Sequence, residues 1–128
     1  MKIIKQVTVF LQNEAGRLEE LTEILGKNDI NISAISVAEA AEFGIARMIV
    51  EDYEKAVRVL KERELSVNLV EVLCVETPDT SGALYEVLKR LSSAGINVSY
   101  MYGYSNNGTA PMIMKVNDPH RALTILNM

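Results

Sequence analysis

Short stretches in which apolar and polar residues alternate are separated along the chain by stretches with helical spacing. Between Val7 and Gln12, Val and Leu occupy every second position, which predicts a strand with one well-buried face. Farther on, Leu18, Leu21 and Leu25 recur at helical spacing with glutamates between them. This spacing predicts an amphipathic helix whose leucines face a core and whose glutamates face water.

The first half of the chain continues in the same manner. The pattern predicts strands at Asn31–Ala38 and Gly44–Glu51 with a polar turn at Glu39–Phe43 between them. Asp52 then has the character of a helix N-cap, and the following apolar residues Ala56, Val57 and Leu60 predict a second helix. The order of elements is therefore β-α-β-β-α.

This order is repeated, because the sequence itself is repeated. The letters "INIS" at Ile30–Ser33 return as "INVS" at Ile96–Ser99, 66 residues later. The same offset of 66 holds without a gap over roughly fifty residues and aligns glycines, turn residues and apolar positions. The second copy predicts the following elements: strand Leu73–Glu76, helix Ala83–Ser93, strand Asn97–Tyr104, hairpin turn "SNNG", strand Pro111–Val116, and helix His120–Leu126 capped by Asp118-Pro119.

Two β-α-β-β-α patterns in tandem predict an α+β fold with two ferredoxin-like (βαββαβ) units and antiparallel sheets, residues 1–70 and 71–128. No Gly or Pro interrupts Ser66–Glu76, so we expect one continuous strand that closes the first unit and opens the second. The offset places Met128 on Glu62, so the second unit lacks its last strand. We expect the position of that strand to be empty or filled by a partner chain.

Composition narrows the possible functions. The net charge of −4, with scattered Lys and Arg, argues against a nucleic-acid partner. No apolar run is long enough to cross a membrane, and Lys5-Gln6 interrupts any signal-like segment. A single cysteine, Cys74, cannot form an internal disulfide, and we expect a cytoplasmic protein.

The sequence contains no group of residues typical of catalysis. His120 is the one histidine, and neither it nor Cys74 has a carboxylate or thiol cluster at metal-binding spacing. The serines have no histidine placed to act as their base. We therefore expect no enzyme activity, no catalytic or metal site and no cofactor.

The unit of about 65 residues, with "NxxG" between first strand and helix and "INI" opening the second strand, resembles the ACT domain. The segment "NEAGRLEELTEILGKNDINISAISVAE" is similar to the regulatory small subunit of acetolactate synthase. The resemblance covers nearly the whole chain as two tandem copies. It implies allosteric regulation of amino-acid metabolism, with a free amino acid sensed at an interface between paired ACT units. We expect a homodimer or a larger even-numbered assembly, because such small units leave sheet edges uncovered.

Candidate ligand-binding residues follow from this resemblance. They are Asn13, Ala15, Gly16 and Asn31 in the first unit and Asp79, Gly82 and Asn97 in the second. At the two glycines the chain enters a helix, where free N–H groups and the helix dipole favour a carboxylate. The resemblance implies that amides at the places of Asn13 and Asn31 bind the amino and carboxylate groups across the interface.

Simpler interpretations of the same residues remain open. Asn13 and Asp79 have the residue types of turn formers, and Asp79 could cap the helix at Ala83. Serine-sensing relatives carry a histidine where this chain has Leu11 and Thr77, which argues against serine and points to an aliphatic or branched ligand. Two alternatives to a stand-alone sensor are an assembly protein whose units pair without ligand and the regulatory subunit of a biosynthetic enzyme such as acetolactate synthase.

Overall fold

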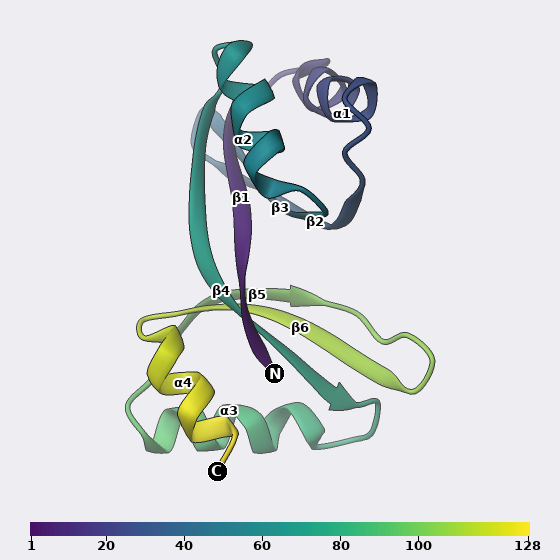
Figure 1. Cartoon of the computed structure of the whole chain (residues 1–128). Helices are drawn as coiled ribbons and strands as arrows, with labels where there is room; N and C mark the ends of the chain where they lie inside the picture. The colour runs from purple at the N-terminus through teal and green to yellow at the C-terminus, as the bar shows by residue number, and fades with distance from the viewer. The chain divides into compact units, whose positions relative to one another are not determined.

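The computed structural model describes residues 1–128, and the fold is the predicted α+β fold with antiparallel strands and four helices (Figure 1). The elements in chain order are β1 (Lys2–Gln12), α1 (Arg17–Lys27), β2 (Ile32–Ala40), β3 (Phe43–Val50), α2 (Tyr53–Glu62), β4 (Ser66–Pro78), α3 (Ala83–Ser93), β5 (Val98–Gly103), β6 (Thr109–Val116) and α4 (Pro119–Leu126). This order is two βαββαβ units, the second without a last strand of its own.

The chain forms two compact units. One unit is Lys5–Val70, called here the first unit, and the other combines Met1–Ile4 with Glu71–Met128, called here the second unit. The predicted uninterrupted strand is confirmed, since β4 runs without a break from Ser66 to Pro78. Both β1 and β4 therefore contribute residues to both units.

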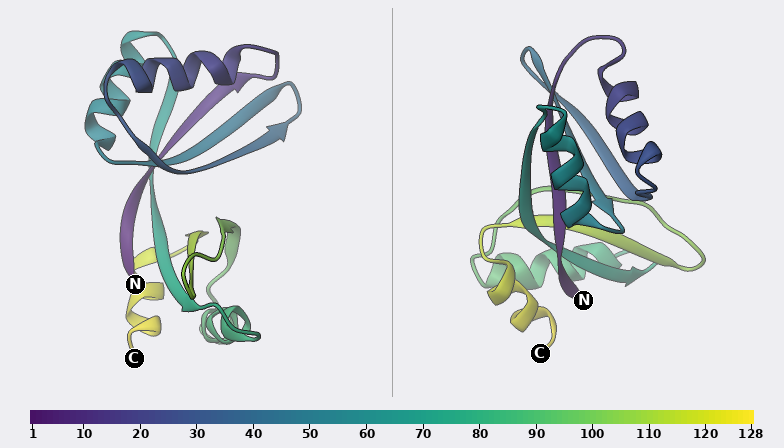
Figure 2. Two further views of the ribbon diagram at one scale, coloured as in Figure 1. Left: turned by 90° about the vertical axis from the view of Figure 1, so that its right-hand side faces the viewer. Right: turned by 45° about the horizontal axis from the view of Figure 1, so that its top comes forward.

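In the first unit the strand order is β2-β3-β1-β4, and α1 and α2 lie on the same side of the strands (Figure 2). The predicted alternation in β1 is confirmed, because Val7, Val9 and Leu11 are buried in the core that the two helices cover. From the helices, this core receives Leu21, Ile24, Leu25, Ala56, Val59 and Leu60. The expectation that Leu18 faces the core is wrong: its side chain is 41% exposed.

The second unit repeats this arrangement with the order β5-β6-β4 and with α3 and α4 supplying the helical side of its core. Leu73 and Val75 of β4 are fully buried there, together with Met114 and Val116 of β6. The repeat is also visible in matched hydrogen bonds. Ile30 donates its N–H to the carbonyl oxygen of Leu25, and the residues 66 positions later, Ile96 and Leu91, form the same bond.

The chain's own N-terminal residues occupy the place where the second unit lacks a strand. The strand β1 follows β4 in the sheet order, and its residues Met1–Ile4 belong to the second unit. Ile3 packs against the second core. The expectation that this position is empty or filled by a partner chain is therefore wrong. The start of β1 reaches it because β1 is eleven residues long, about twice the usual length of a strand.

Most of the helix caps and turns predicted from the sequence are present in the structure. Asp52 and Asp118 cap α2 and α4, since each side chain accepts a hydrogen bond from the backbone N–H three residues later, at 3.1 Å. The "SNNG" turn is present, with Asn107 and Gly108 at positive φ. The turn predicted at Glu39–Phe43 is shorter than expected, because β2 and β3 extend to leave only two residues between them.

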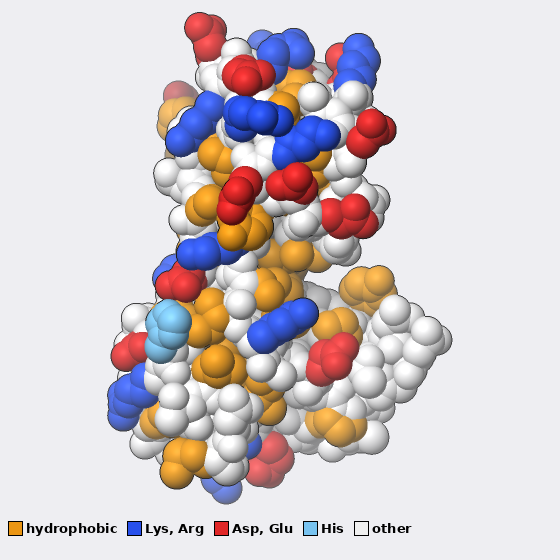
Figure 3. Space-filling model, in the orientation of Figure 1, with side chains coloured by type: hydrophobic (Ala, Val, Ile, Leu, Met, Phe, Trp, Pro, Cys, Tyr) orange, Lys and Arg blue, Asp and Glu red, His pale blue; other side chains and the backbone are white.

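Charged side chains of both signs share the surface. In the view of Figure 3, Lys and Arg side chains lie among Asp and Glu side chains, and no area of one sign dominates. None of the helices combines the length and the apolar character that a membrane crossing requires.

Candidate functional site

The loop between β1 and α1 is held by the hairpin that joins β2 and β3. The N–H of Asn13 donates to the carbonyl oxygen of Glu42 at 3.1 Å. In the second unit the N–H of Asp79 donates to the carbonyl oxygen of Gly108 at 3.0 Å, and both partners lie 66 residues after their counterparts. The backbone at the two candidate loops is thus anchored in the same way.

Each candidate glycine is the N-cap of the helix that follows. Gly16 has φ +91° and Gly82 has φ +85°, a left-handed conformation that a residue with a Cβ adopts only with strain. No side chain caps either helix. Of the two interpretations of Asp79, the one in which its side chain caps the helix at Ala83 is therefore wrong. The first turns of α1 and α3 have no side-chain acceptor at the N-cap, which is the arrangement that favours a carboxylate.

The two remaining asparagines lie where the second strand of each unit begins. Asn31 accepts the N–H of Glu51 on its carbonyl oxygen at 3.2 Å, and Asn97 accepts the N–H of Asn117 at 3.3 Å. Asn97 also donates its own N–H to the Asn117 side chain at 3.0 Å. All of these contacts use the backbone of Asn31 and Asn97, and both residues are exposed.

The first unit does not bring its candidate residues together. Asn13 is bonded to Glu42, just before β3, whereas Asn31 is bonded to Glu51, just after β3. Glu42 and Glu51 are nine residues apart along this strand, roughly 30 Å at 3.3 Å per residue. Asn13, Ala15 and Gly16 therefore lie at one end of the sheet and Asn31 at the other. The second unit has the same separation, with Asp79 and Gly82 at one end and Asn97 at the other.

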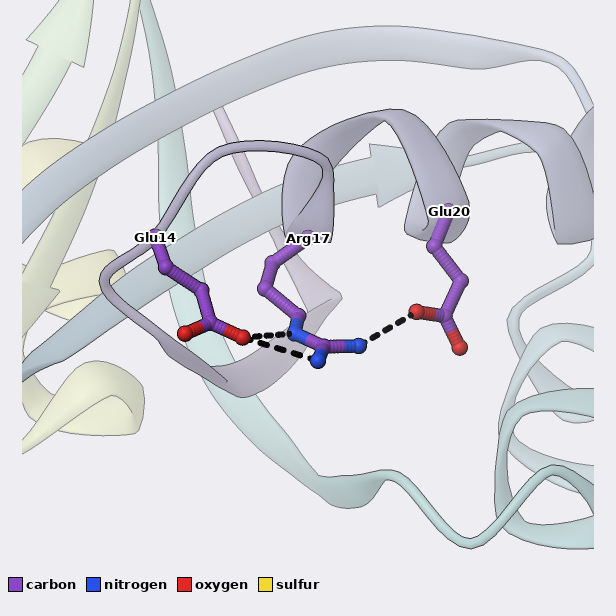
Figure 4. Close-up of polar contacts among 3 residues, drawn as sticks. All are labelled: Glu14, Arg17 and Glu20. Carbon is purple, nitrogen blue, oxygen red and sulfur yellow. Dashed lines mark hydrogen bonds and ion pairs between the residues drawn. The ribbon is translucent and has the colours of Figure 1, made fainter.

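Sequence reasoning missed a cluster of charged side chains at the candidate loop of the first unit. Arg17, the first residue of α1, donates from Nε to Glu14 at 2.8 Å and from Nη1 to Glu20 at 3.0 Å (Figure 4). The pKa of Arg17 is raised above its ordinary value, mainly by the hydrogen bond to Glu14 and secondly by the hydrogen bond to Glu20. The regular spacing of three residues between Glu14, Arg17 and Glu20 is a sequence signal that predicts such contacts on a helix.

The equivalent loop of the second unit has a different charge. Adding 66 to Glu14 and Arg17 gives Thr80 and Ala83, so the second loop has no guanidinium and no carboxylate at these places. Instead, Asp79 stands where the first unit has Asn13. At this position the first loop therefore has an uncharged amide, and the second has a carboxylate.

The positions used to infer the ligand's side chain face inward. Leu11 is 6% exposed and belongs to the first core. Thr77 is 5% exposed, and its hydroxyl donates to the carbonyl oxygen of Ala110 at 3.3 Å. Leu11 therefore gives no support to an aliphatic or branched ligand.

Other polar features of the surface lie elsewhere. A shallow open pocket at the start of α2 is lined by Asp52, Glu54, Lys55 and Arg58, and it contains none of the candidate residues. Cys74 is half-buried, and burial raises the pKa of its thiol. On the surface, Nε2 of His120 lies 3.5 Å from Oε1 of Glu71. No group of three or more His, Cys, Asp or Glu is placed to hold a metal ion.

Comparison with solved structures finds a similar protein with the same architecture throughout. Protein BT0572 from Bacteroides thetaiotaomicron is 40% identical with a TM-score of 0.94, covering 98% of this chain and 87% of that one. The regulatory subunit of aspartate kinase from Thermus thermophilus has 11% identity and a TM-score of 0.69, covering 99% and 96%. That from Thermus flavus has 12% identity and a TM-score of 0.66, covering 98% and 94%. At this identity the two kinase subunits share the fold alone.

Comparison with curated proteins finds no match. The family model described as "ACT domain pair", in contrast, matches residues 1–128, the whole chain. The two repeated units, their βαββαβ order and this match agree, and the chain belongs to the ACT family of regulatory domains as an ACT domain pair.

Proposed function

We propose that this chain is a regulatory module that binds a free amino acid at an interface between ACT units. The observation that carries the proposal is the paired loop geometry. Asn13 and Asp79 are anchored by equivalent backbone hydrogen bonds, and each precedes a left-handed glycine that begins a helix without a side-chain cap. Helix N-termini of this kind favour a carboxylate, and an amide favours either end of a zwitterion.

In the first unit the ligand carboxylate binds to the backbone at the start of α1. Arg17 is beside this position, but two carboxylates already surround its guanidinium, so the local side-chain charge is −1. That charge attracts the ammonium group of an amino acid more than its carboxylate. The N–H of Arg17 already donates to the carbonyl oxygen of Glu14 at 3.4 Å. We therefore assign the carboxylate to the N–H groups of Leu18 and Glu19, and the ammonium group to the side of the loop that carries Glu14.

The second unit contributes Asp79, Gly82 and Asn97 to the same function, but its affinity for the ligand carboxylate differs from that of the first unit. Its loop has a carboxylate at Asp79, Glu86 stands in the first turn of α3, and no arginine is present, so the local side-chain charge is −2. A ligand carboxylate is therefore repelled there more strongly than in the first unit. We propose that the first unit holds the tighter amino-acid site.

Isothermal titration calorimetry with each of the twenty amino acids tests the proposal. We expect one or a few of them to bind, and Asn31→Ala to weaken binding by about 1–3 kcal/mol through loss of a hydrogen bond to a charged group. Asn68→Ala is the matched control, because Asn68 is an exposed asparagine on β4 outside the candidate set. Absence of any heat of binding at millimolar amino acid would contradict the proposal and favour an assembly protein that pairs without ligand.

A further inference from the structure

The turn between β5 and β6 contains a reactive pair of residues that the candidate site does not use. Asn107 is followed by Gly108, and no other asparagine of the chain precedes a glycine. The side-chain amide of an asparagine can react with the backbone nitrogen of the next residue. Glycine leaves that nitrogen sterically open, because it has no Cβ. Asn107 is therefore the asparagine at which this intramolecular reaction is least hindered.

Both reacting groups are accessible and have no protein partner. Asn107 and Gly108 are exposed, and a Cβ built at Gly108 would meet no atom within 4 Å. The side chain of Asn107 makes no hydrogen bond, and the N–H of Gly108 donates to no acceptor of the chain. Neither group therefore has to give up a hydrogen bond before it reacts.

The conformation of the turn nevertheless protects Asn107. The N–H of Asn106 donates to the carbonyl oxygen of Thr109 at 2.7 Å, and the N–H of Thr109 donates to that of Asn106 at 3.2 Å. Between them, Asn107 has φ +52° and Gly108 has φ +84°, as in a two-residue hairpin turn. In the left-handed region, ψ of Asn107 places the Gly108 nitrogen roughly opposite Cβ across the Cα–C bond. Ring closure requires both on the same side, so the turn has to open first.

The same turn anchors the candidate loop of the second unit. The carbonyl oxygen of Gly108 accepts the N–H of Asp79 at 3.0 Å, and the two loops lie at the same end of this unit (Figure 1). Rotation about the Cα–C bond of Asn107, which ring closure requires, displaces Gly108 and its carbonyl oxygen. The reaction of Asn107 and the anchoring of Asp79 are therefore alternatives.

We propose that Asn107 is a site of spontaneous deamidation and that its conversion releases the Asp79 loop from the β5–β6 turn. The Gly108 nitrogen loses its proton and forms a bond to Cγ of Asn107. The bond between Cγ and Nδ2 breaks, and Nδ2 leaves with that proton as ammonia. The product is a five-membered cyclic imide. Water then cleaves one of the two bonds between the imide nitrogen and the carbonyl carbons of residue 107, which gives either aspartate or isoaspartate.

The two products change the turn to different extents. Both add one negative charge at position 107. In isoaspartate the main chain also runs through Cβ and Cγ, so the turn becomes one atom longer. A two-residue turn fits the twist of its strands only with its regular backbone. Isoaspartate therefore separates Gly108 from Asp79, whereas aspartate keeps the backbone and changes the charge alone.

The equivalent turn of the first unit is immune to this reaction. Residues Ala41 and Glu42 lie 66 positions earlier. Ala41 also has a positive φ, +57°, and the carbonyl oxygen of Glu42 accepts the N–H of Asn13 at 3.1 Å. This turn has the same anchoring role but no side-chain amide and no glycine. Deamidation therefore alters one loop of the repeated pair and leaves the other unchanged.

Peptide mass spectrometry of the parent chain, incubated at mildly alkaline pH, tests the site. We expect Asn107 to convert before any other asparagine and to yield isoaspartate as well as aspartate. Conversion in the folded chain should be at least about tenfold slower than in urea, because minor open conformers are populated at roughly 0.1–10%. Earlier conversion of another asparagine overturns the site, and equal rates in the two solvents overturn its protection by the turn.

Hydrogen exchange of the chromatographically separated isoaspartate form tests the release of the loop. The amide of Asp79 should lose protection, while the amide of Asn13 in the first unit keeps it. Asn107→Gly is the matched control, because two glycines suit the same turn and the reactive side chain is gone. This variant should keep the Asp79 amide protected after the same incubation. An Asp79 amide that stays protected in the isoaspartate form overturns the release.

Transfer of the reactive pair to the first unit gives an independent measurement. In the double variant Ala41→Asn with Glu42→Gly, we expect a second conversion at position 41 and loss of protection of the Asn13 amide. No conversion there would show that an Asn-Gly pair in such a turn is not sufficient and would overturn the proposed mechanism. No ligand enters any of these measurements, so their outcomes do not depend on the proposed function.

Discussion

Asn13 and Asn31 lie at opposite ends of the sheet in the first unit, although both are candidates for one ligand site. Asn13 is bonded to Glu42 before β3 and Asn31 to Glu51 after it. A single unit therefore cannot use both side chains on one small ligand. A site that contains both side chains therefore needs one amide from each of two units, and the strands of these two units must run in opposite directions.

Mixing two inactive variants tests whether the site is shared between chains. Asn13→Ala and Asn31→Ala homodimers should each bind poorly, because every site in them lacks one amide. After unfolding and refolding together, half of the dimers are mixed, and each mixed dimer has one intact site. Calorimetry should then recover about one quarter of the parent's sites in a two-fold dimer. No recovery would mean that the two residues act within one chain or not at all.

Gly16 and Gly82 should be intolerant of alanine because of their backbone alone. Each has a positive φ, and a Cβ built at either position meets no atom within 4 Å. Gly16→Ala or Gly82→Ala should therefore lower the free energy of unfolding by about 1–2 kcal/mol through left-handed strain. Urea denaturation measures this loss.

A glycine in the same helix provides the control for this strain. Gly26 lies inside α1, has no positive φ and has the same open surroundings. Gly26→Ala should raise the free energy of unfolding by about 0.5–1 kcal/mol through helix propensity. Equal changes in the free energy of unfolding for Gly16→Ala and Gly26→Ala would show that the backbone at Gly16 is not strained.

The aspartates before the helices should contribute unequally to stability. Asp52 and Asp118 cap α2 and α4, so replacing either with Ala should cost about 1 kcal/mol. Asp79 caps nothing, and Asp79→Ala should change stability by less than about 0.5 kcal/mol. Thermal and urea unfolding of the three variants compare these costs, and a large loss from Asp79→Ala would contradict the cap assignment.

Local signals explain why most of the fold could be predicted. The alternation in β1 and the caps at Asp52 and Asp118 depend on residues that are neighbours in sequence, and the repeat is found by comparing the two halves of the sequence directly. The unbroken strand β4 was predictable because Ser66–Glu76 contains no Gly or Pro and only Asn68 as a turn-forming residue. Leu18 was misplaced because helical spacing gives the direction of a side chain but not how far the strands extend beneath it.

The parts that were not predicted depend on long-range pairing. Nothing near Ile3 indicates that the start of β1 belongs to a unit that otherwise begins at Glu71. The separation of Asn13 from Asn31 follows from the connection of β1 to β2 over β3, which places both strands in the same direction. It could have been deduced from the predicted topology, whereas the position of Ile3 could not.

Burial of Cys74 should protect it from alkylation. Its thiol pKa is raised by burial, so a smaller fraction is thiolate at pH 8 than for an ordinary cysteine. Iodoacetamide should therefore react more slowly with the folded chain than with the chain in urea, and the folded rate should rise further with pH. Mass spectrometry of timed samples measures both rates, and equal rates at pH 8 would contradict a raised pKa.

The start of β1 should stabilise the second unit more than the first. Ile3 is partly buried against the core that contains Leu73 and Met114, so Ile3→Ala removes contacts from that core. We expect a loss of about 1–2 kcal/mol, less than for a fully buried isoleucine. Hydrogen exchange should become faster in β6 and in the Glu71–Pro78 part of β4, while the centre of α1 keeps its protection. Lys2→Ala, at an exposed neighbouring position, should leave exchange unchanged. Uniform loss of protection across both units after Ile3→Ala would show that Met1–Ile4 does not act as the second unit's missing strand.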